Sequence, residues 1–126
     1  MSLKTPLGRV LGLGTAGGAH HWWVQRVSAV ALVPLGAWFV VALVRLPDLG
    51  YATLRAWLAQ PAHAVLMLLV VALAAYHSRL GVQVVVEDYV HARGRKLAAL
   101  LVNDYAHVVV AAAGLYAILR VAGGAP

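Results

Sequence analysis

The stretch PAHAVLMLLVVALAAYHSRLGVQVVV, residues 61–86, decides how the rest of the chain must fold. Past its first turn it is interrupted only by His77-Ser78-Arg79 and Gln83. It is longer than the about 20 residues that an α-helix needs to cross a bilayer. Because a segment in lipid must satisfy its own backbone hydrogen bonds, we expect a transmembrane helix here.

Two further stretches have the same character. One covers residues 27–46 and meets no charge before Arg45, and the other covers residues 97–121. Three such stretches are too few for a membrane β-barrel. We therefore predict an all-α integral membrane protein with three transmembrane helices at about 27–46, 61–86 and 97–121, in a single membrane-anchor domain over residues 1–126.

The composition supports a membrane protein. The 126 residues are 63% hydrophobic and 11% charged, and the mean hydropathy is +0.82. Soluble domains are about 45–50% apolar and about 25% charged, and a chain of this size buries only about 60–70% of its surface. The net charge of +6 does not indicate nucleic-acid binding, because too few polar residues remain for a water-exposed basic face. Without cysteine, the chain holds no disulfide, all-cysteine iron–sulfur site or covalent c-type haem.

Turn-forming residues separate the predicted spans. The glycine-rich beginning, residues 1–18, is expected to be a flexible cytoplasmic segment. Residues 46–50 (LPDLG) predict a turn, and residues 51–60 predict a short interfacial helix or loop. Residues 92–96 (ARGRK) connect the second and third spans, and Pro34 is expected to bend the first helix.

The distribution of basic residues predicts the orientation in the membrane. Cytoplasmic flanks carry the excess of lysine and arginine. One side receives six of these residues, namely Lys4, Arg9, Arg26, Arg93, Arg95 and Lys96, and the other receives three, namely Arg45, Arg55 and Arg120. The amino terminus is therefore expected inside and the carboxyl terminus outside. The first span is too long and too late in the chain for a cleavable signal, whose apolar core is about 7–15 residues.

His77 is the ionisable residue at depth that most requires an explanation. On a helix, the residues within about 60° of it include Val70, Ala74, Gly81, Val84 and Asp88. A neutral imidazole between small residues suits an axial haem ligand, since Ala74 and Gly81 leave room for a flat macrocycle. A histidine that hydrogen-bonds a neighbouring helix fits the same pattern. No second histidine lies one turn away on this helix, so a bis-histidine haem would take its other ligand from another helix or chain.

Glu87-Asp88-Tyr89 closes the second span. Carboxylates at a helix carboxyl terminus oppose the helix dipole, which favours a functional or interface role for them. The Tyr89 phenol suits either an aromatic-belt anchor or a hydrogen-bond donor to a carbonyl ligand that enters from the lipid.

Three other polar features within or beside the spans have two explanations each. Arg26 either reaches lipid headgroups or pairs with a carboxylate or propionate at the same depth. Arg79, inside the second span, needs a carboxylate or a watery cavity, or must extend to the interface. Polar residues in the first half of the third span indicate either that its helix begins later than hydropathy implies or that it lines a polar interface; these are Asn103, Asp104 and His107.

Two stretches resemble a known family. His77, ten intervening residues and Asp88-Tyr89 are similar to the H-x10-D-Y signature of the hydrophobic membrane-anchor subunit (D-subunit type) of succinate dehydrogenase, complex II. The runs HSRLGVQVVVEDYVH, residues 77–91, and HWWVQRVSA, residues 21–29, resemble the alphaproteobacterial form. The resemblance extends from Ala19 onward.

The resemblance implies a role for each matching residue. His77 would be one axial ligand of haem b, shared with a second, cytochrome b anchor subunit. Tyr89 would hydrogen-bond a ubiquinone carbonyl, with Asp88 supporting that site, and Arg26 would lie near the haem propionates. The implied partners are a flavoprotein subunit and an iron–sulfur subunit, and the implied location is the bacterial inner membrane.

On this basis the chain is expected to anchor succinate:ubiquinone oxidoreductase, without a succinate-oxidising site of its own. One alternative is a non-redox scaffold or accessory subunit whose polar residues only hold helices together. A second is a small transporter with Arg79 and Asp104 in its path, although three spans are few for a pathway without oligomerisation.

Overall fold

Three long helices and one short helix make up the computed structural model, which describes residues 16–124. They are α2 (Ala16–Val44), α3 (Tyr51–Leu58), α4 (Pro61–Tyr89) and α5 (Arg93–Ala122). α2, α4 and α5 each contain a segment long and apolar enough to cross a membrane, namely His20–Val44, Pro61–Tyr89 and Arg93–Ala122. The prediction of an all-α protein with three membrane-spanning helices is confirmed.

The helix bounds differ most from the predicted spans at the starts of α2 and α5. α2 begins at Ala16, so residues 16–18 form its first turn although a loop was expected there. The first backbone N–H groups of any helix lack intrahelical acceptors, so glycines are tolerated at this end. α5 begins at Arg93 rather than at about residue 97, and the link from α4 is correspondingly shorter. Hydropathy detects only apolar residues, whereas the backbone continues the helix through the polar ends. The remainder of the predicted flexible start, residues 1–15, lies outside the described residues.

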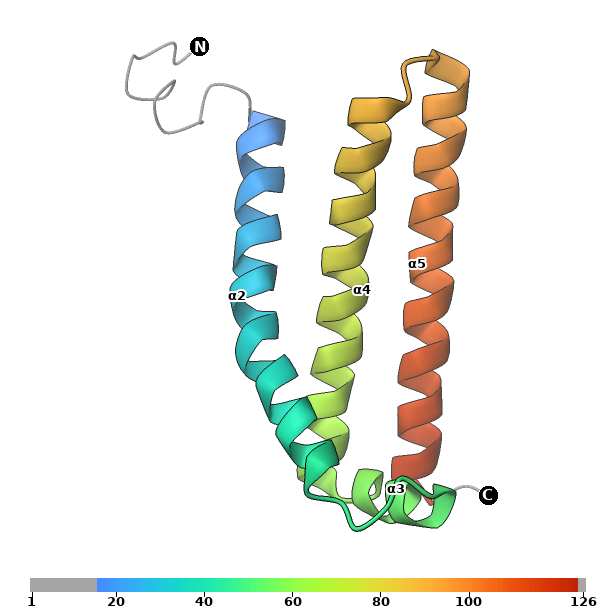
Figure 1. Cartoon of the computed structure of the whole chain (residues 1–126). Coiled ribbons are helices and arrows are strands. Elements are labelled where there is room, and N and C mark those ends of the chain that lie inside the picture. The colour runs from blue at the N-terminus through green and yellow to red at the C-terminus, as the bar shows by residue number, and fades with distance from the viewer. Residues whose placement is uncertain (1–15, 125–126) are drawn as a thin grey trace.

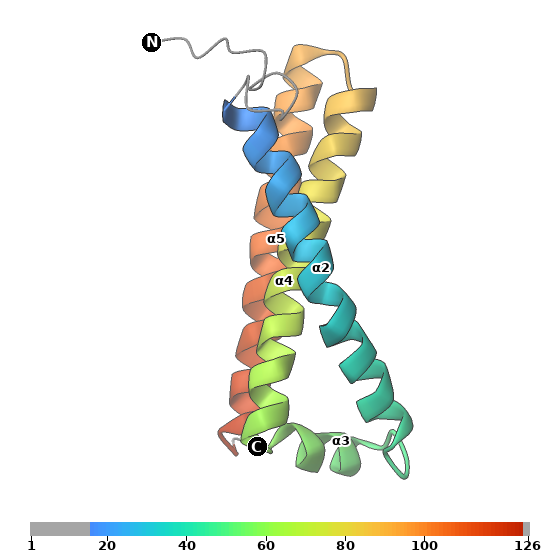
Figure 2. The ribbon, with the colours of Figure 1, turned by 90° about the vertical axis from the view of Figure 1, so that its left-hand side faces the viewer.

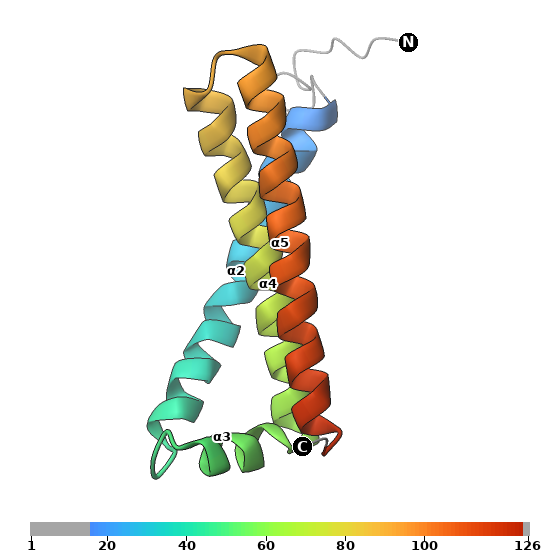
Figure 3. The same cartoon turned by 90° about the vertical axis from the view of Figure 1, so that its right-hand side faces the viewer.

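α4 and α5 are antiparallel neighbours along their lengths, and α2 packs against α4 (Figure 1). α2 crosses α4 at an angle and diverges from it towards α3, which bridges the open end (Figures 2 and 3). The start of α2 and the α4–α5 link lie at the same end of the molecule (Figure 1). Arg93, Arg95 and Lys96 therefore share an end with the start of α2, as the predicted orientation requires.

Pro34 lies inside α2, and the helix continues through it. Proline lacks the N–H that would bond the carbonyl one turn earlier, which weakens the helix at that point. α2 bends along its length (Figure 1). This is the bend that the sequence predicts.

The turn before α3 is fixed by Asp48. Its Oδ1 accepts a hydrogen bond from the Gly50 N–H at 2.7 Å. Hydrogen bonds from the Thr53 side chain and from this N–H hold the pKa of Asp48 below its usual value. A side chain at Gly50 would meet the same carboxylate, since a Cβ there would lie 2.8 Å from Oδ1. The predicted turn and the predicted short helix are both present.

Few side chains are buried between these helices. Within residues 20–124, the buried ones are Ser28, Ala64, Leu80, Asn103 and Ile118. Two of the five are polar, and each of these two marks a contact between helices. Most of the large apolar side chains face outward, which suits a chain whose surroundings are lipid and other membrane helices.

Candidate functional site

His77 bonds α2 through a buried serine. Ser28 Oγ lies 2.9 Å from His77 Nδ1, although the two residues are 49 apart in sequence. Ser28 is 4% exposed, and its Oγ also donates to the Gln25 carbonyl oxygen at 3.0 Å. This contact fixes the imidazole ring from one side at the place where α2 and α4 meet.

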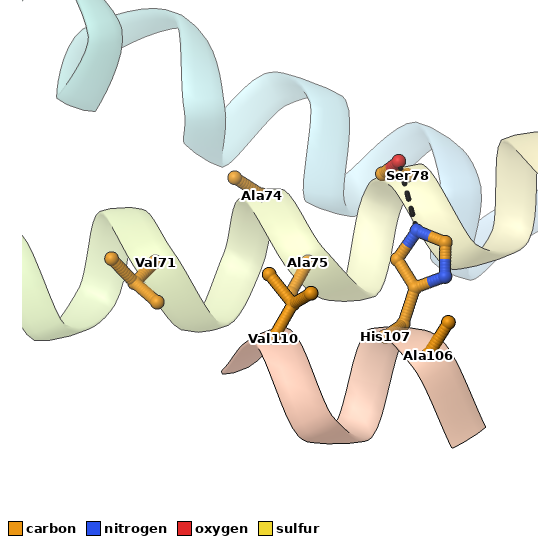
Figure 4. Close-up of a pocket in the computed structure, with 7 residues that line it drawn as sticks. All are labelled: Val71, Ala74, Ala75, Ser78, Ala106, His107 and Val110. Atoms are coloured by element: carbon orange, nitrogen blue, oxygen red, sulfur yellow. Dashed lines mark hydrogen bonds between the residues drawn. The ribbon is translucent and has the colours of Figure 1, made fainter. Parts of the chain in front are cut away.

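The second ring nitrogen of His77, Nε2, has no partner within the described residues. His77 is half-buried, and its Nε2 makes no hydrogen bond within residues 16–124. Ala74, one turn earlier on α4, lines an apolar groove between α4 and α5 (Figure 4). Gly81, one turn later on α4, lies near α2, because a Cβ on it would lie 3.7 Å from Nε2 of Gln25.

The donor set at His77 fits a haem better than a protein-only metal site. Within the described part of the chain, no three His, Cys, Asp or Glu side chains gather closely enough to hold a metal ion. A single imidazole suffices for iron when a porphyrin supplies the four equatorial nitrogens. The bonded Nδ1 and the unbonded Nε2 are the arrangement that a metal-ligating histidine requires.

A polar stripe on α2 accompanies this contact. His21, Gln25 and Ser28 are spaced at i, i+4 and i+7, which puts them on one face of the helix. His21 Nε2 and Gln25 Oε1 are both buried without a hydrogen-bond partner. Buried polar atoms without partners are uncommon, so this stripe has capacity for a further polar group or a water molecule.

Arg26 does not join His77 within this chain. Its guanidinium carbon lies 4.8 Å from the ring centroid of Trp22, in a cation–π contact. Helix geometry places Arg26 about 160° around α2 from Ser28. The arginine is exposed, so it faces the surroundings of α2 rather than α4.

Asp88 and Tyr89 lie at the end of α4, about 16 Å along the helix axis from His77. Tyr89 is 78% exposed and lines a surface pocket at the α4–α5 link, with Val90, His91, Ala92, Arg95 and Ala99. Asp88 is exposed and makes no hydrogen bond or ion pair with residues 16–124. Glu87, by contrast, accepts a bond from Gln83 Nε2 at 2.8 Å. Asp88 and Tyr89 are both exposed and able to contact a ligand.

The polar residues of the third span form a seam with α4. Arg79 Nε donates to Asp104 Oδ1 at 2.7 Å, and Asn103 Nδ2 donates to the Arg79 carbonyl oxygen at 3.0 Å. His107 Nδ1 donates to the Asn103 carbonyl oxygen at 2.8 Å, and His107 Nε2 lies 3.1 Å from Ser78 Oγ (Figure 4). We call these five residues the α4–α5 seam.

The seam decides between the explanations that the sequence left open. The third helix does not begin later than hydropathy implies; it lines a polar interface. Arg79 has the carboxylate that it needs in lipid. His107 has a partner at each ring nitrogen, which distinguishes it from His77.

The opposite end of the molecule carries an aromatic stack. The Trp57 and His63 rings are stacked with centroids 4.6 Å apart, and Trp38 stacks on Trp57 at 5.8 Å. His63 Nδ1 donates to the Trp57 carbonyl oxygen at 2.8 Å. This stack ties α3 to α2 and α4.

Sequence reasoning predicted His77 but assigned no role to its partner. The spacing of His21, Gln25 and Ser28 on one face of α2 was the available signal, because three polar residues in register are unexpected on a membrane helix. Which helix that face meets depends on the crossing of α2 and α4.

Comparison with known proteins gives consistent matches. Residues 1–116 match the family described as succinate dehydrogenase/fumarate reductase transmembrane subunit. The succinate dehydrogenase hydrophobic membrane anchor subunit of Paracoccus denitrificans is 34% identical over 126 residues, covering 99% of this chain and 97% of that protein. The subunit of the same name from Rickettsia felis is 31% identical over 96 residues, covering 75% of this chain and 80% of that protein. No solved structure matches significantly.

Proposed function

Because this chain belongs to the succinate dehydrogenase/fumarate reductase transmembrane subunit family, we propose that it holds haem b through His77 and forms part of a ubiquinone site with Asp88 and Tyr89. The chain is a hydrophobic membrane anchor subunit of succinate dehydrogenase and a multi-pass protein of the bacterial inner membrane. The proposal adds the cofactor, the site and the residues that serve each.

The observation that carries the haem proposal is the state of the two ring nitrogens of His77. Nδ1 is bonded to Ser28 of α2, and Nε2 makes no bond to the described residues. An imidazole nitrogen without a hydrogen bond is costly in an apolar environment, which favours a ligand at Nε2 of His77. Bound there, haem b supplies a one-electron carrier.

A haem held by two histidines would need its other ligand from outside this helix, since α4 offers no other histidine one turn from His77. We propose that it comes from a second, cytochrome b anchor subunit. The exposed apolar faces of α2, α4 and α5 give such a subunit a surface to cover. The remaining proposed partners are the flavoprotein and iron–sulfur subunits, which would oxidise succinate and deliver electrons.

At the quinone, the proposed roles of this chain's residues follow from their chemistry. Reduction to quinol takes two electrons and two protons, and negative charge develops on the quinone oxygens as electrons arrive. The Tyr89 phenol, exposed at the end of α4, would donate a hydrogen bond to one of these oxygens. Asp88 beside it would support the site and its proton supply. Arg26, exposed on α2, is proposed to meet a haem propionate at the cytoplasmic edge.

The test is the haem content of the intact complex purified with His77→Ala. We expect the low-spin haem spectrum to be lost or strongly perturbed. Retention of the wild-type spectrum and haem content would favour the scaffold alternative, in which His77 only joins α4 to α2.

A further inference from the structure

The hydroxyl of Ser28 has a single proton and two short contacts. Oγ lies 3.0 Å from the Gln25 carbonyl oxygen and 2.9 Å from His77 Nδ1. A carbonyl oxygen only accepts hydrogen bonds, so the contact to Gln25 requires the serine proton. Oγ then accepts from the other side, and both contacts are satisfied together only when His77 Nδ1 carries a proton.

From this we infer that Ser28 is a positioning residue for His77: it fixes the Nδ1–H tautomer and so presents the Nε2 lone pair to the haem iron. This inference rests on the proposed function and extends it to a residue on a different helix. It assigns the ligating atom, which the sequence pattern does not.

Burial makes Ser28 the group that sets the tautomer. The serine is 4% exposed and lies in the α2–α4 contact, so its hydroxyl is shielded from water. Its own orientation is fixed by a carbonyl one turn earlier on α2. The hydroxyl therefore cannot rotate to donate to Nδ1 without losing its bond to Gln25.

The acceptor at Nδ1–H also affects the iron. When the ring nitrogen that does not bind the metal donates a hydrogen bond, the ligating imidazole becomes more basic. A more basic ligand stabilises ferric over ferrous iron. Removal of the Ser28 hydroxyl should therefore shift the haem midpoint potential in the positive direction.

The experiment compares three variants of the full complex by reductive titration of the haem absorbance and by its low-spin EPR spectrum. Ser28→Ala removes the acceptor, and Ser28→Thr retains a hydroxyl. Ser78→Ala is the matched control, because it deletes the same hydroxyl from a serine–histidine contact that involves His107 instead.

We expect Ser28→Ala to shift the midpoint potential positively and to change the EPR g-values, with Ser28→Thr and Ser78→Ala close to wild type. A Ser28→Ala titration that superimposes on wild type would overturn the inference, as would an equal shift in Ser78→Ala. If Ser28→Ala binds no haem, Ser28→Thr decides: a wild-type potential supports the inference, and a shifted potential or lost haem contradicts it.

Failure of the proposed function has a different signature. If His77→Ala keeps the wild-type haem spectrum, His77 is not the ligand and the inference falls with it. If His77→Ala loses the haem but Ser28→Ala leaves the midpoint potential and the EPR spectrum unchanged, His77 remains the proposed ligand. Only the role inferred for Ser28 is then wrong.

Discussion

Arg79 of α4 and Asp104 of α5 form an ion pair inside the membrane-spanning region, with Nε and Oδ1 2.7 Å apart. Their side chains are 33% and 42% exposed, so the ion pair lies at the surface of the helix bundle rather than in its core. In lipid neither charge can be left alone without cost. The pair therefore explains how a chain this apolar accommodates an arginine and an aspartate at depth.

Arg79→Ala should destabilise the complex by about 2.5–3.5 kcal/mol, the order of cost of a charge left in the bilayer interior, because Asp104 loses its partner. Asp104→Ala should have a similar effect. The double variant should be more stable than the sum of the single losses predicts. Thermal unfolding of the four complexes measures this coupling, and strictly additive losses would show that the two residues do not interact.

Gly114 of α5 packs tightly against Val71 of α4. A Cβ at this position would lie 2.9 Å from Cγ1 of Val71. We expect Gly114→Ala to lower stability by about 1–3 kcal/mol, the usual cost of overpacking. Gly36→Ala is the control, because nothing in the described chain lies within 4 Å of a Cβ there. Equal melting temperatures for the two variants would contradict the packing described for α4 and α5.

Trp57 should hold α3 in place. An isolated helix as short as Tyr51–Leu58 is unstable by itself, so its order depends on packing. Trp57→Ala removes the stack with Trp38 and His63 and should increase hydrogen exchange of α3 amides by about tenfold or more, leaving α4 unchanged. Tyr51→Ala, at a residue 73% exposed, should have little effect. Unchanged exchange in Trp57→Ala would show that other contacts fix α3.

Tyr89→Phe should slow quinone reduction by about tenfold, the effect of losing one hydrogen bond of about 1.4 kcal/mol. Assembly and haem content should not change, because Tyr89 is 78% exposed. Tyr116→Phe removes the same hydroxyl from an exposed position on α5 and should retain wild-type turnover. A Tyr89→Phe complex with wild-type turnover would remove Tyr89 from the proposed site.

Much of the architecture was predictable because hydropathy and turn residues act locally. The three spans, the turn before α3 and the bend at Pro34 follow from short stretches of sequence. Helix ends were predicted less well: α2 and α5 both begin before their apolar segments, since backbone hydrogen bonding continues where side chains become polar.

The candidate site was predictable only in part. His77, Asp88 and Tyr89 stood out because polar groups are costly in a membrane helix. The partnership of His77 with Ser28 depends on how α2 crosses α4, and the partnership of Arg79 with Asp104 depends on the register of α4 and α5. These are tertiary relationships between distant residues, and the pattern along one helix does not contain them.

The central claim is that His77, among the membrane histidines of this chain, binds the haem. It is tested most directly by the reduced-minus-oxidised spectra of the complex purified with His77→Ala and, in parallel, with His107→Ala. His107 lies at a comparable position on α5, but both of its ring nitrogens already have partners. We expect His77→Ala to lose or strongly alter the low-spin haem bands and His107→Ala to retain them. Intact bands in His77→Ala, or loss of the bands in His107→Ala alone, would contradict the claim.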